Sequence, residues 1–399
     1  MARTRPPGGR LLAGIALVLC LATTLTACGG AAPAPGGRGS APTSGSAAPA
    51  GGSAAAPASP GAPAAGSVPP PAPPTAARAA ATYQPDPPLD PPQTVTVCTV
   101  HSVPDGVTLI ALQRGYFEAE GLKVNLVPFA LTSQALSSLG TNQLDVVVGG
   151  VNGALYNQIA RGVDVRVVAD GGSTAPGYDW QGIAVRQDLL DSGRYKAPGD
   201  LKGLKLNEVS LAGVSHYYVD LLLQQHGVGP NDLELAQLPY PDALAAFTTK
   251  GVDASALIEP YLSRAETVGA KVVLRSLDIS ADVPGAAVLM SPGFIANRQA
   301  SVRFLIGWLR GVRDYLRAFA DPAARTQLIQ FFQSNDIDAD QRMQVPTFDP
   351  NGLPPARPFE AHLAYMEQTG VVTSPVRIDQ VIDASLVREA AQKLGPYQP

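Results

Sequence analysis

Cysteine is scarce in this chain, and its three cysteines are placed where they can do little chemistry. Cys20 lies within a predicted amino-terminal leader and Cys28 directly follows it as the predicted lipidation site, so Cys98 is the one free thiol expected in the remaining chain. A disulfide framework within one mature chain is therefore excluded. Cys98 lies inside the apolar run 95–100, which favours a buried and inert thiol. We expect no metal site and no cofactor.

Charge is also sparse, at 16% of the residues, with a formal net charge of -4. Acidic residues outnumber basic ones, 33 to 29, so no basic face for nucleic acid is implied. The chain contains no His-Glu-x-x-His or Gly-x-Ser-x-Gly motif. The glycine-rich stretch 149–153 departs from the dinucleotide fingerprint, because Val151 stands where a glycine is required. We expect no nucleic acid partner, no catalytic residue and no enzyme activity.

No apolar run is long enough to span a bilayer, but the amino-terminal end has the pattern of a secretory leader. Arginines in residues 3–10 precede the apolar run 11–24, and small residues precede Cys28. The stretch Leu25-Thr26-Ala27-Cys28 resembles a bacterial lipobox. It predicts a signal peptide over 1–27, acylation of Cys28 and anchoring to the outer face of the cell membrane. An ordinary signal peptide with Cys28 unmodified is the alternative.

A long segment of low complexity follows the leader. From residue 29 to about 92 the composition is mainly Ala, Pro, Gly and Ser, with a few charges. Such a segment buries too little apolar surface to offset the entropy of ordering. The sequence therefore predicts a lipidated cysteine and a disordered tether over 28–92. A wall-spanning or glycosylated stalk is the alternative.

Residues 93–399 are globular in composition, and short apolar segments alternate there with helical patterns. The expected strands are 94–98, 123–127, 144–148, 165–169, 182–185, 205–207, 234–238, 254–258 and 286–290. The expected helices lie around 109–117, 133–139, 154–160, 215–226, 242–248, 359–368 and 379–394, with two more opened by Ser301 and by Asp321-Pro322. This alternation predicts right-handed βαβ units and α/β lobes with mixed, mainly parallel sheets.

Several spaced motifs carry a resemblance to a known family. In chain order they are Ala-Leu-Gln-Arg-Gly-Tyr-Phe at 111–117, Glu-Gly-Leu-Lys-Val at 120–124, Gln-Leu-Asp-Val-Val-Val-Gly at 143–149, Asp-Leu-Lys-Gly-Leu-Lys at 200–205, Gly-Val-Asp-Ala-Ser-Ala-Leu-Ile-Glu-Pro-Tyr at 251–261, and Phe-Ile-Ala-Asn at 294–297. Together they resemble solute-binding proteins of the nitrate/sulfonate/taurine type, a broad family that includes carriers of thiamine pyrimidine precursors. The resemblance covers roughly residues 93–320.

The resemblance implies a two-lobed periplasmic-binding-protein-like fold of type II. Lobe 1 would comprise 93–181 and 284–399 with the C-terminal helices, and lobe 2 would comprise 182–283. Ligand would lie in the cleft, near the carboxyl ends of strands and the amino ends of helices, where backbone amides favour an anionic or polar group. Hinge bending would close the lobes over it.

The resemblance also implies a function. The chain would be an extracytoplasmic lipoprotein that captures a small organic solute, of heteroaromatic or sulfonate type, and delivers it to an ABC permease with its ATPase. The protein itself would be a monomer. A lipoprotein that senses ligand for a membrane receptor is an alternative. An enzyme on the same fold, such as a lyase of menaquinone synthesis, is a less favoured one.

Candidate ligand contacts in the first half of the chain follow predicted strands. His101 and Ser102 follow the first strand directly, and Asn152 follows the third strand where a helix begins. A solvated histidine and a plain tight turn are the structural alternatives. Tyr178, Asp179 and Trp180 form an aromatic and acidic cluster that could hold a flat ring and accept hydrogen bonds from its N–H groups. A loop anchored on Trp180 would leave the same pattern.

Further candidates lie in the expected second lobe. Ser215, His216 and Tyr217 open its first long helix, where an amino end would face the cleft, although Ser215 also fits a simple N-cap. Glu259 and Tyr261 flank Pro260 after a strand, so the carboxylate could project into the cleft or pair across the hinge.

Overall fold

The structure is a computed structural model that describes residues 83–229 and 232–399, all within one compact unit. The predicted signal peptide, the lipidation site at Cys28 and the predicted tether as far as residue 82 lie outside the described residues. In the described part of the chain, no helix has the length and apolar character needed to cross a membrane.

The first sheet has five strands in the order β2-β1-β3-β10-β4. Their bounds are Gln93–Thr99 for β1, Leu122–Pro128 for β2, Val146–Gly150 for β3, Arg166–Gly172 for β4 and Ala286–Met290 for β10. Strand β1 pairs in parallel with β2 and β3, and β10 runs antiparallel to both β3 and β4. All strands but β10 therefore run in one direction, which confirms the predicted mixed, mainly parallel sheet.

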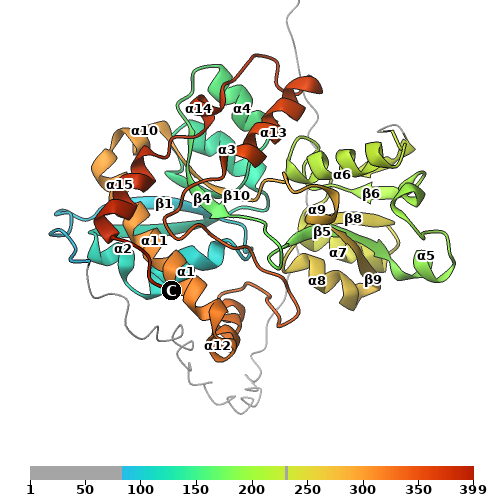
Figure 1. Ribbon diagram of the computed structural model, residues 1–399, viewed down its shortest axis with the longest axis horizontal. Helices are drawn as coiled ribbons and strands as arrows, with labels where there is room; N and C mark the ends of the chain where they lie inside the picture. Colours follow the sequence, from blue (N-terminus) through green and yellow to red (C-terminus); the bar gives the residue numbers. More distant parts are fainter. Residues whose placement is uncertain (1–82, 230–231) are drawn as a thin grey trace, which may run out of the picture. The chain divides into compact units, whose positions relative to one another are not determined.

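The second sheet repeats this arrangement in the order β7-β6-β8-β5-β9. Its strands are β5 (Gln181–Arg186), β6 (Lys205–Asn207), β7 (Glu234–Ala236), β8 (Ala254–Ile258) and β9 (Ala270–Arg275). Here β5 is the strand that runs antiparallel to its neighbours. We call the first sheet with its helices lobe 1 and the second sheet with its helices lobe 2 (Figure 1). Because β10 follows β9 along the chain but joins the first sheet, lobe 2 is an insertion into lobe 1.

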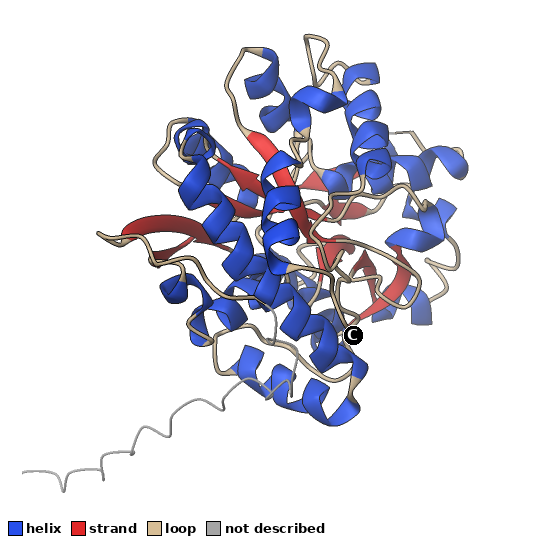
Figure 2. Cartoon of the chain, turned by 60° about the vertical axis from the view of Figure 1, so that its left-hand side comes forward, coloured by secondary structure: helices blue, strands red, loops and turns tan. Residues whose placement is uncertain are grey.

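Helices cover both faces of the lobe 1 sheet (Figure 2). The helices are α1 (Asp105–Gln113), α2 (Tyr116–Ala119), α3 (Thr132–Gly140), α4 (Gly153–Ala160), α10 (Pro292–Ala296), α11 (Arg298–Ala320), α12 (Pro322–Gln333), α13 (Ala356–Gln368), α14 (Ile378–Val381) and α15 (Ser385–Leu394). Alternation along β3 separates two cores, because Val146 and Val148 pack with α1 and α11, whereas Val147 packs with α3 and α4. Cys98 lies in the second of these cores, where burial raises the pKa of its thiol to about 12.

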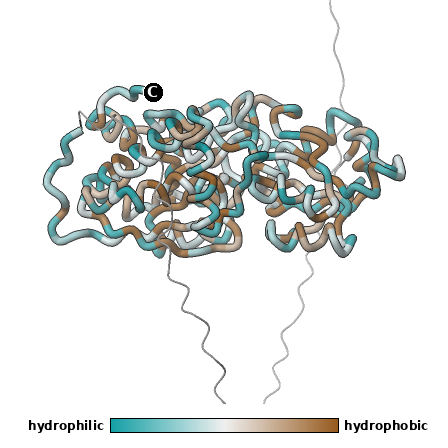
Figure 3. Tube along the Cα trace, turned by 90° about the horizontal axis from the view of Figure 1, so that it is seen from below, coloured by the Kyte–Doolittle hydropathy of each residue, from teal (hydrophilic) through white to brown (hydrophobic). Residues whose placement is uncertain are grey.

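Lobe 2 is smaller. Its helices are α5 (Gln187–Asp191), α6 (Val214–Gln225), α7 (Tyr240–Thr248), α8 (Tyr261–Ala265) and α9 (Ser276–Ile279). Apolar stretches recur along the trace of both lobes between hydrophilic loops, as the strands and helix faces require (Figure 3). Strand β9 was not among the expected strands. It lies at the edge of its sheet and is largely half-buried, so its sequence does not show the continuous apolar run of a central strand.

Two predicted helix starts are wrong. Helix α11 begins at Arg298, where Asn297 caps it by accepting a hydrogen bond from Ala300 N–H, while Ser301 is buried and donates to the Phe294 carbonyl. Helix α6 has Gly213 at its N-cap, so Ser215 lies inside the first turn. The start at Asp321-Pro322 is confirmed, since Asp321 accepts from Ala323 N–H at 2.9 Å.

The end of the chain also differs from expectation. The expected helix 379–394 is divided into α14 and α15, because Ile382 pairs with Val167 of β4 and the Asp383 N–H donates to the Val167 carbonyl at 2.9 Å.

The last residues of the expected tether, 83–92, lie against lobe 1. There the Tyr83 hydroxyl donates to Glu120 at 2.6 Å and the Pro87 carbonyl accepts from Arg303.

Candidate functional site

A cavity lies between the two sheets and is lined by residues of both lobes and of the linker before β5. Its empty volume is about 780 Å³, part of which is open to solvent. Apolar side chains, including Val100, Leu131, Val151, Val214 and Ile258, form much of its wall. Hydroxyl groups come from Ser102, Thr132, Ser133, Ser210, Ser215 and Tyr240. Among the residues that the structure describes, none of those lining the cavity carries a charge.

Five of the described helices begin at this cavity, where Pro104 precedes α1 and Tyr240 opens α7. The other three, α3, α4 and α6, have no acidic residue in the first turn. Thr132 opens α3, Asn152 precedes α4 and Gly213 precedes α6, and all three residues line the cavity. Asn152 caps α4 by accepting from Leu155 N–H at 3.0 Å, whereas α3 and α6 have no side-chain cap. The amino end of a helix carries a partial positive charge and free N–H groups. The cavity can therefore attract an anionic group without any cationic side chain.

The loop between β1 and α1 forms part of the wall and is organised by Asp105. Its Oδ2 accepts hydrogen bonds from Val100 N–H at 3.2 Å, Ser102 N–H at 2.8 Å and the Ser102 hydroxyl at 3.1 Å. Burial raises the pKa of the Asp105 carboxyl to about 6, although these hydrogen bonds oppose the shift. His101, which lies between Val100 and Ser102 in the chain, has a left-handed backbone with φ at 53°.

Trp180 lines the cavity and carries a buried indole N–H without a partner in the described part of the chain. Its side chain lines the cavity and is 4% exposed, and its Nε1 has no hydrogen-bond partner among the described residues. Buried tryptophan N–H groups usually have a partner. The Nε1 of Trp308, in the lobe 1 core, also lacks a partner among the described residues, and Trp180 differs from it in lining the cavity.

The structure brings part of the predicted site together. Ser102, Asn152, Trp180 and Ser215 line the cavity. His101 and Tyr261 instead line a neighbouring cavity with Arg264, and the half-exposed Tyr178 lines a third one beside Arg325.

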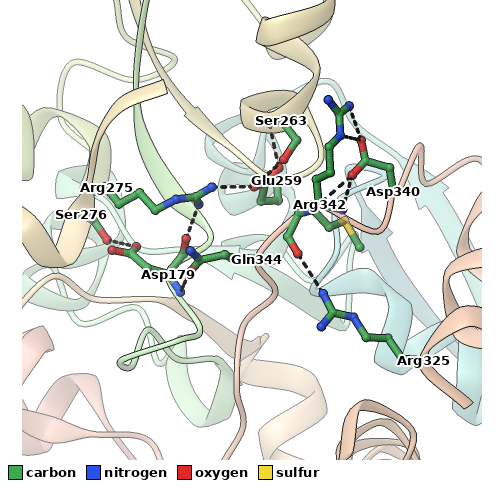
Figure 4. A network of polar contacts seen from close by, with 10 residues as sticks. Asp179, Glu259, Ser263, Arg275, Ser276, Arg325, Asp340, Arg342 and Gln344 are labelled. Carbon is green, nitrogen blue, oxygen red and sulfur yellow. Dashed lines mark hydrogen bonds and ion pairs between the residues drawn. The ribbon is translucent and has the colours of Figure 1, made fainter. Parts of the chain in front are cut away.

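Asp179 and Glu259 belong to a polar network (Figure 4). Neither lines the cavity, although their chain neighbours Trp180 and Ile258 do. The Asp179 carboxylate accepts from the Ser276 hydroxyl at 2.7 Å and from Leu277 N–H at 2.7 Å. Glu259 is fully buried and accepts from the N–H and hydroxyl of Ser263, each at 2.9 Å. Burial raises the pKa of the Glu259 carboxyl. Both carboxylates therefore accept hydrogen bonds from protein donors, and neither residue lines the cavity.

His216 and Tyr217 face a different neighbour. His216 Nδ1 lies 2.7 Å from Glu208 Oε2, and burial opposes protonation of the ring but Glu208 raises its pKa overall. Tyr217 is buried against His362 and Tyr365 of α13. The ring of His216 also faces Tyr365, with centroids 6.3 Å apart, so both residues of α6 contact α13 and neither lines the cavity.

Sequence reasoning missed Thr132, Ser133 and Tyr240, which line the cavity at the starts of α3 and α7. Each follows the carboxyl end of a strand, so the position in the fold was the available signal. Tyr240 stacks on Tyr261, with ring centroids 5.1 Å apart, and so stands between the cavity and its neighbour.

Comparisons with known proteins agree with this architecture. The sequence model of a family described as NMT1-like matches residues 90–332. A putative aliphatic sulfonates-binding protein of Bacillus subtilis (strain 168) is 32% identical over 205 residues, which cover 49% of this chain. The chain spans 58% of the length of that relative.

Two solved structures show the same fold. The periplasmic nitrate-binding protein NrtA of Synechocystis PCC 6803 has a TM-score of 0.62 at 14% identity, covering 75% of this chain and 88% of that one. The periplasmic aliphatic sulphonate binding protein SsuA of Escherichia coli has a TM-score of 0.55 at 20% identity, covering 73% and 92%. At these identities the likeness is one of fold, that of periplasmic binding proteins.

Proposed function

The chain belongs to the NMT1-like family, and we propose that it is an extracytoplasmic solute-binding protein for organic sulfonates. One observation carries the proposal. The interlobe cavity combines apolar walls with the amino ends of three helices that have no acidic residue in the first turn, and no residue among its described lining carries a charge. The relative named for aliphatic sulfonates supports the same ligand class.

The cavity wall suits an anion attached to an apolar body. Backbone amides and hydroxyls near Thr132 and Ser215 would hold the sulfonate oxygens, and Val100, Leu131 and Ile258 would contact the carbon chain. An amino group on the ligand would meet no carboxylate there, so taurine is disfavoured against alkanesulfonates. Nitrate would leave the apolar wall unused.

A heteroaromatic ligand has less support. Ring N–H groups would need an acceptor, and the expected one, Asp179, already accepts from Ser276 and Leu277. Asp179 does not line the cavity. Removing it from those donors would leave buried polar groups unpaired, at a cost of about 1–3 kcal/mol.

The cellular role extends the same proposal. Acylation of Cys28 would hold the protein on the outer face of the membrane, and an ABC permease with its ATPase would receive the solute. The protein would act as a monomer and catalyse no reaction. Presentation of ligand to a membrane receptor would use the same cavity, and permease and ATPase genes beside this one would favour import.

A thermal-shift screen of the purified chain tests the ligand class. The panel contains butanesulfonate, hexanesulfonate, taurine, nitrate and an aminopyrimidine. A ligand at 100 times its dissociation constant stabilises by about 2.7 kcal/mol, so the alkanesulfonates should raise the melting temperature clearly. Stabilisation by the aminopyrimidine alone, or by no member of the panel, would contradict the proposal. Chemical turnover of a sulfonate would contradict the binding role.

A further inference from the structure

Helix α13 lies beside α4 of lobe 1 and reaches α6 of lobe 2 (Figure 1). The family match ends at residue 332, so α13 belongs to the part of the chain that the match does not cover. On one side, His362 Nδ1 is hydrogen-bonded to the Tyr156 hydroxyl of α4 at 2.9 Å. On the other side, the Tyr365 hydroxyl donates to Asp220 of α6 at 2.9 Å.

These contacts are buried. His362 and Tyr156 are 0% exposed, and Tyr365 and Asp220 are each 7% exposed. The ring of Tyr217 on α6 also contacts both α13 rings. Its centroid lies 5.5 Å from that of His362 and 5.2 Å from that of Tyr365. One apolar core runs through this region and includes residues of both lobes together with Phe359, Leu363 and Met366 of α13. Buried contacts of this kind contribute far more than surface ones.

Helix α13 is fixed to lobe 1 by more than the Tyr156 contact. After the helix, the Val371 carbonyl accepts from the Asn157 side chain of α4 at 2.8 Å, and Ile382 then pairs with Val167 of β4. The contacts between α13 and α6 are therefore contacts between the lobes. Two exposed ion pairs, Arg264–Asp338 and Arg357–Asp282, also join the C-terminal segment to lobe 2, but surface pairs contribute about 0–1 kcal/mol.

The helices that α13 joins, α4 and α6, are two of those that begin at the cavity. At their amino ends the lobes touch directly, because Gly153 N–H of α4 donates to the Ala212 carbonyl at 2.9 Å and Asn152 pairs with Gly213. His362 Nε2 is buried and has no hydrogen-bond partner among the described residues. Burial lowers the pKa of His362 to about 3, so its ring is neutral and suits this dry position.

We propose that His362 and Tyr365 are positioning residues for ligand capture, which clamp α4 and α6 together and hold the lobes closed before ligand arrives. The inference rests on the proposed function, because it concerns the same cavity. Neither residue lines the cavity. They act through α4 and α6. Because the lobes are already held closed, the free-energy cost of closing them no longer reduces the affinity for ligand.

Amide hydrogen exchange at Gly153 tests the clamp without ligand, since this N–H bonds across the lobes. The variant Tyr365→Phe keeps the ring but removes the hydroxyl that Asp220 accepts from. Its matched control is Tyr116→Phe, which removes a similar hydroxyl bonded to Asp314 at 2.6 Å inside lobe 1. We expect Gly153 exchange to be about tenfold faster in Tyr365→Phe than in the unaltered protein, and within twofold of it in Tyr116→Phe.

A conservative change at the partner separates positioning from general loss of structure. Asp220→Asn keeps an oxygen that can accept from Tyr365, so its Gly153 exchange should stay close to that of the unaltered protein, whereas Asp220→Leu should match Tyr365→Phe. Circular dichroism verifies that each variant is folded. Unprotected Gly153 in the unaltered protein, or equal exchange in Tyr365→Phe and the unaltered protein, would overturn the clamp.

Ligand-binding measurements on the same variants distinguish a failure of this inference from a failure of the proposed function. If hexanesulfonate binds the unaltered protein, its dissociation constant should rise about tenfold in Tyr365→Phe and stay unchanged in Tyr116→Phe. Equal affinity in Tyr365→Phe would overturn the positioning role. If no sulfonate binds the unaltered protein, the proposed function fails, while the exchange rates of unliganded Gly153 still decide whether α13 clamps the lobes.

Discussion

The carboxylate of Asp105 accepts hydrogen bonds from both the backbone N–H and the hydroxyl of Ser102, at 2.8 and 3.1 Å. Asp105 is the first residue of α1, and it thereby sets the shape of the loop 100–104, which follows β1 and lines the cavity. The carboxylate is almost fully buried, and this burial raises its pKa to about 6 from 3.8. The loop is held by a group that titrates in a mildly acidic range.

This shift predicts a pH dependence of stability. The folded protein binds the Asp105 proton more tightly than the unfolded chain does, so its contribution to the free energy of unfolding falls as pH rises from about 4 to about 6. The difference in unfolding free energy between the unaltered protein and Asp105→Asn, measured by urea denaturation, should fall across that window and be level above about pH 7. Asp170 has a similar shift and is present in both proteins, so the difference isolates Asp105. A difference that rises with pH would show that the shift has the opposite sign.

The unsatisfied indole N–H predicts an effect on affinity. Trp180→Phe keeps an aromatic ring in the cavity wall but removes the donor, so binding of hexanesulfonate should weaken about tenfold. Trp308→Phe is the control, because Trp308 is buried in the lobe 1 core. The chain has two tryptophans, so Trp308→Phe also leaves Trp180 as the sole indole reporter, whose emission should change on ligand addition. Unchanged affinity in Trp180→Phe would remove the donor from the site.

Glu259 is predicted to stabilise the folded protein and not to contact the ligand. Glu259→Ala would leave the two Ser263 donors unpaired and remove an ion-pair partner of Arg275 at 3.5 Å. Unfolding free energy should fall by about 3 kcal/mol, as for loss of one partner in a buried pair. The folded fraction should bind ligand normally, because Glu259 does not line the cavity.

A surface ion pair of lobe 2 provides the control for this change. Glu234 pairs with Lys205 at 2.9 Å, and both side chains are exposed. Glu234→Ala should therefore cost less than about 1 kcal/mol in the same denaturation experiment. Equal losses in the two variants, or weaker ligand binding in Glu259→Ala alone, would contradict the assignment.

The architecture could be predicted from the sequence because it is written in local patterns. The expected strands 205–207, 254–258 and 286–290 agree with β6, β8 and β10 residue for residue. Their apolar runs are short and lie between turn residues, and alternation with helices predicts mainly parallel sheets. The errors lie where tertiary contacts override local signals, as at Ser301, whose hydroxyl bonds to Phe294 inside the fold instead of capping a helix.

The site was only partly predictable, because neighbouring residues can face different environments. Ser102 lines the cavity, whereas the left-handed backbone at His101 places that residue in the neighbouring cavity. The Asp179 carboxylate accepts a hydrogen bond from the hydroxyl of Ser276, which lies 97 residues further along the chain. No local pattern encodes such a pairing.

By itself, the sequence determined that this chain builds α/β lobes and that its family resemblance points to a bound solute, since strand and helix periodicity are local properties of the side chains. Tertiary structure alone decided which polar groups face the cavity and that α13 reaches across to lobe 2. Those outcomes depend on partners such as Asp220 and Tyr365, separated by 145 residues, and folding alone brings them within 2.9 Å.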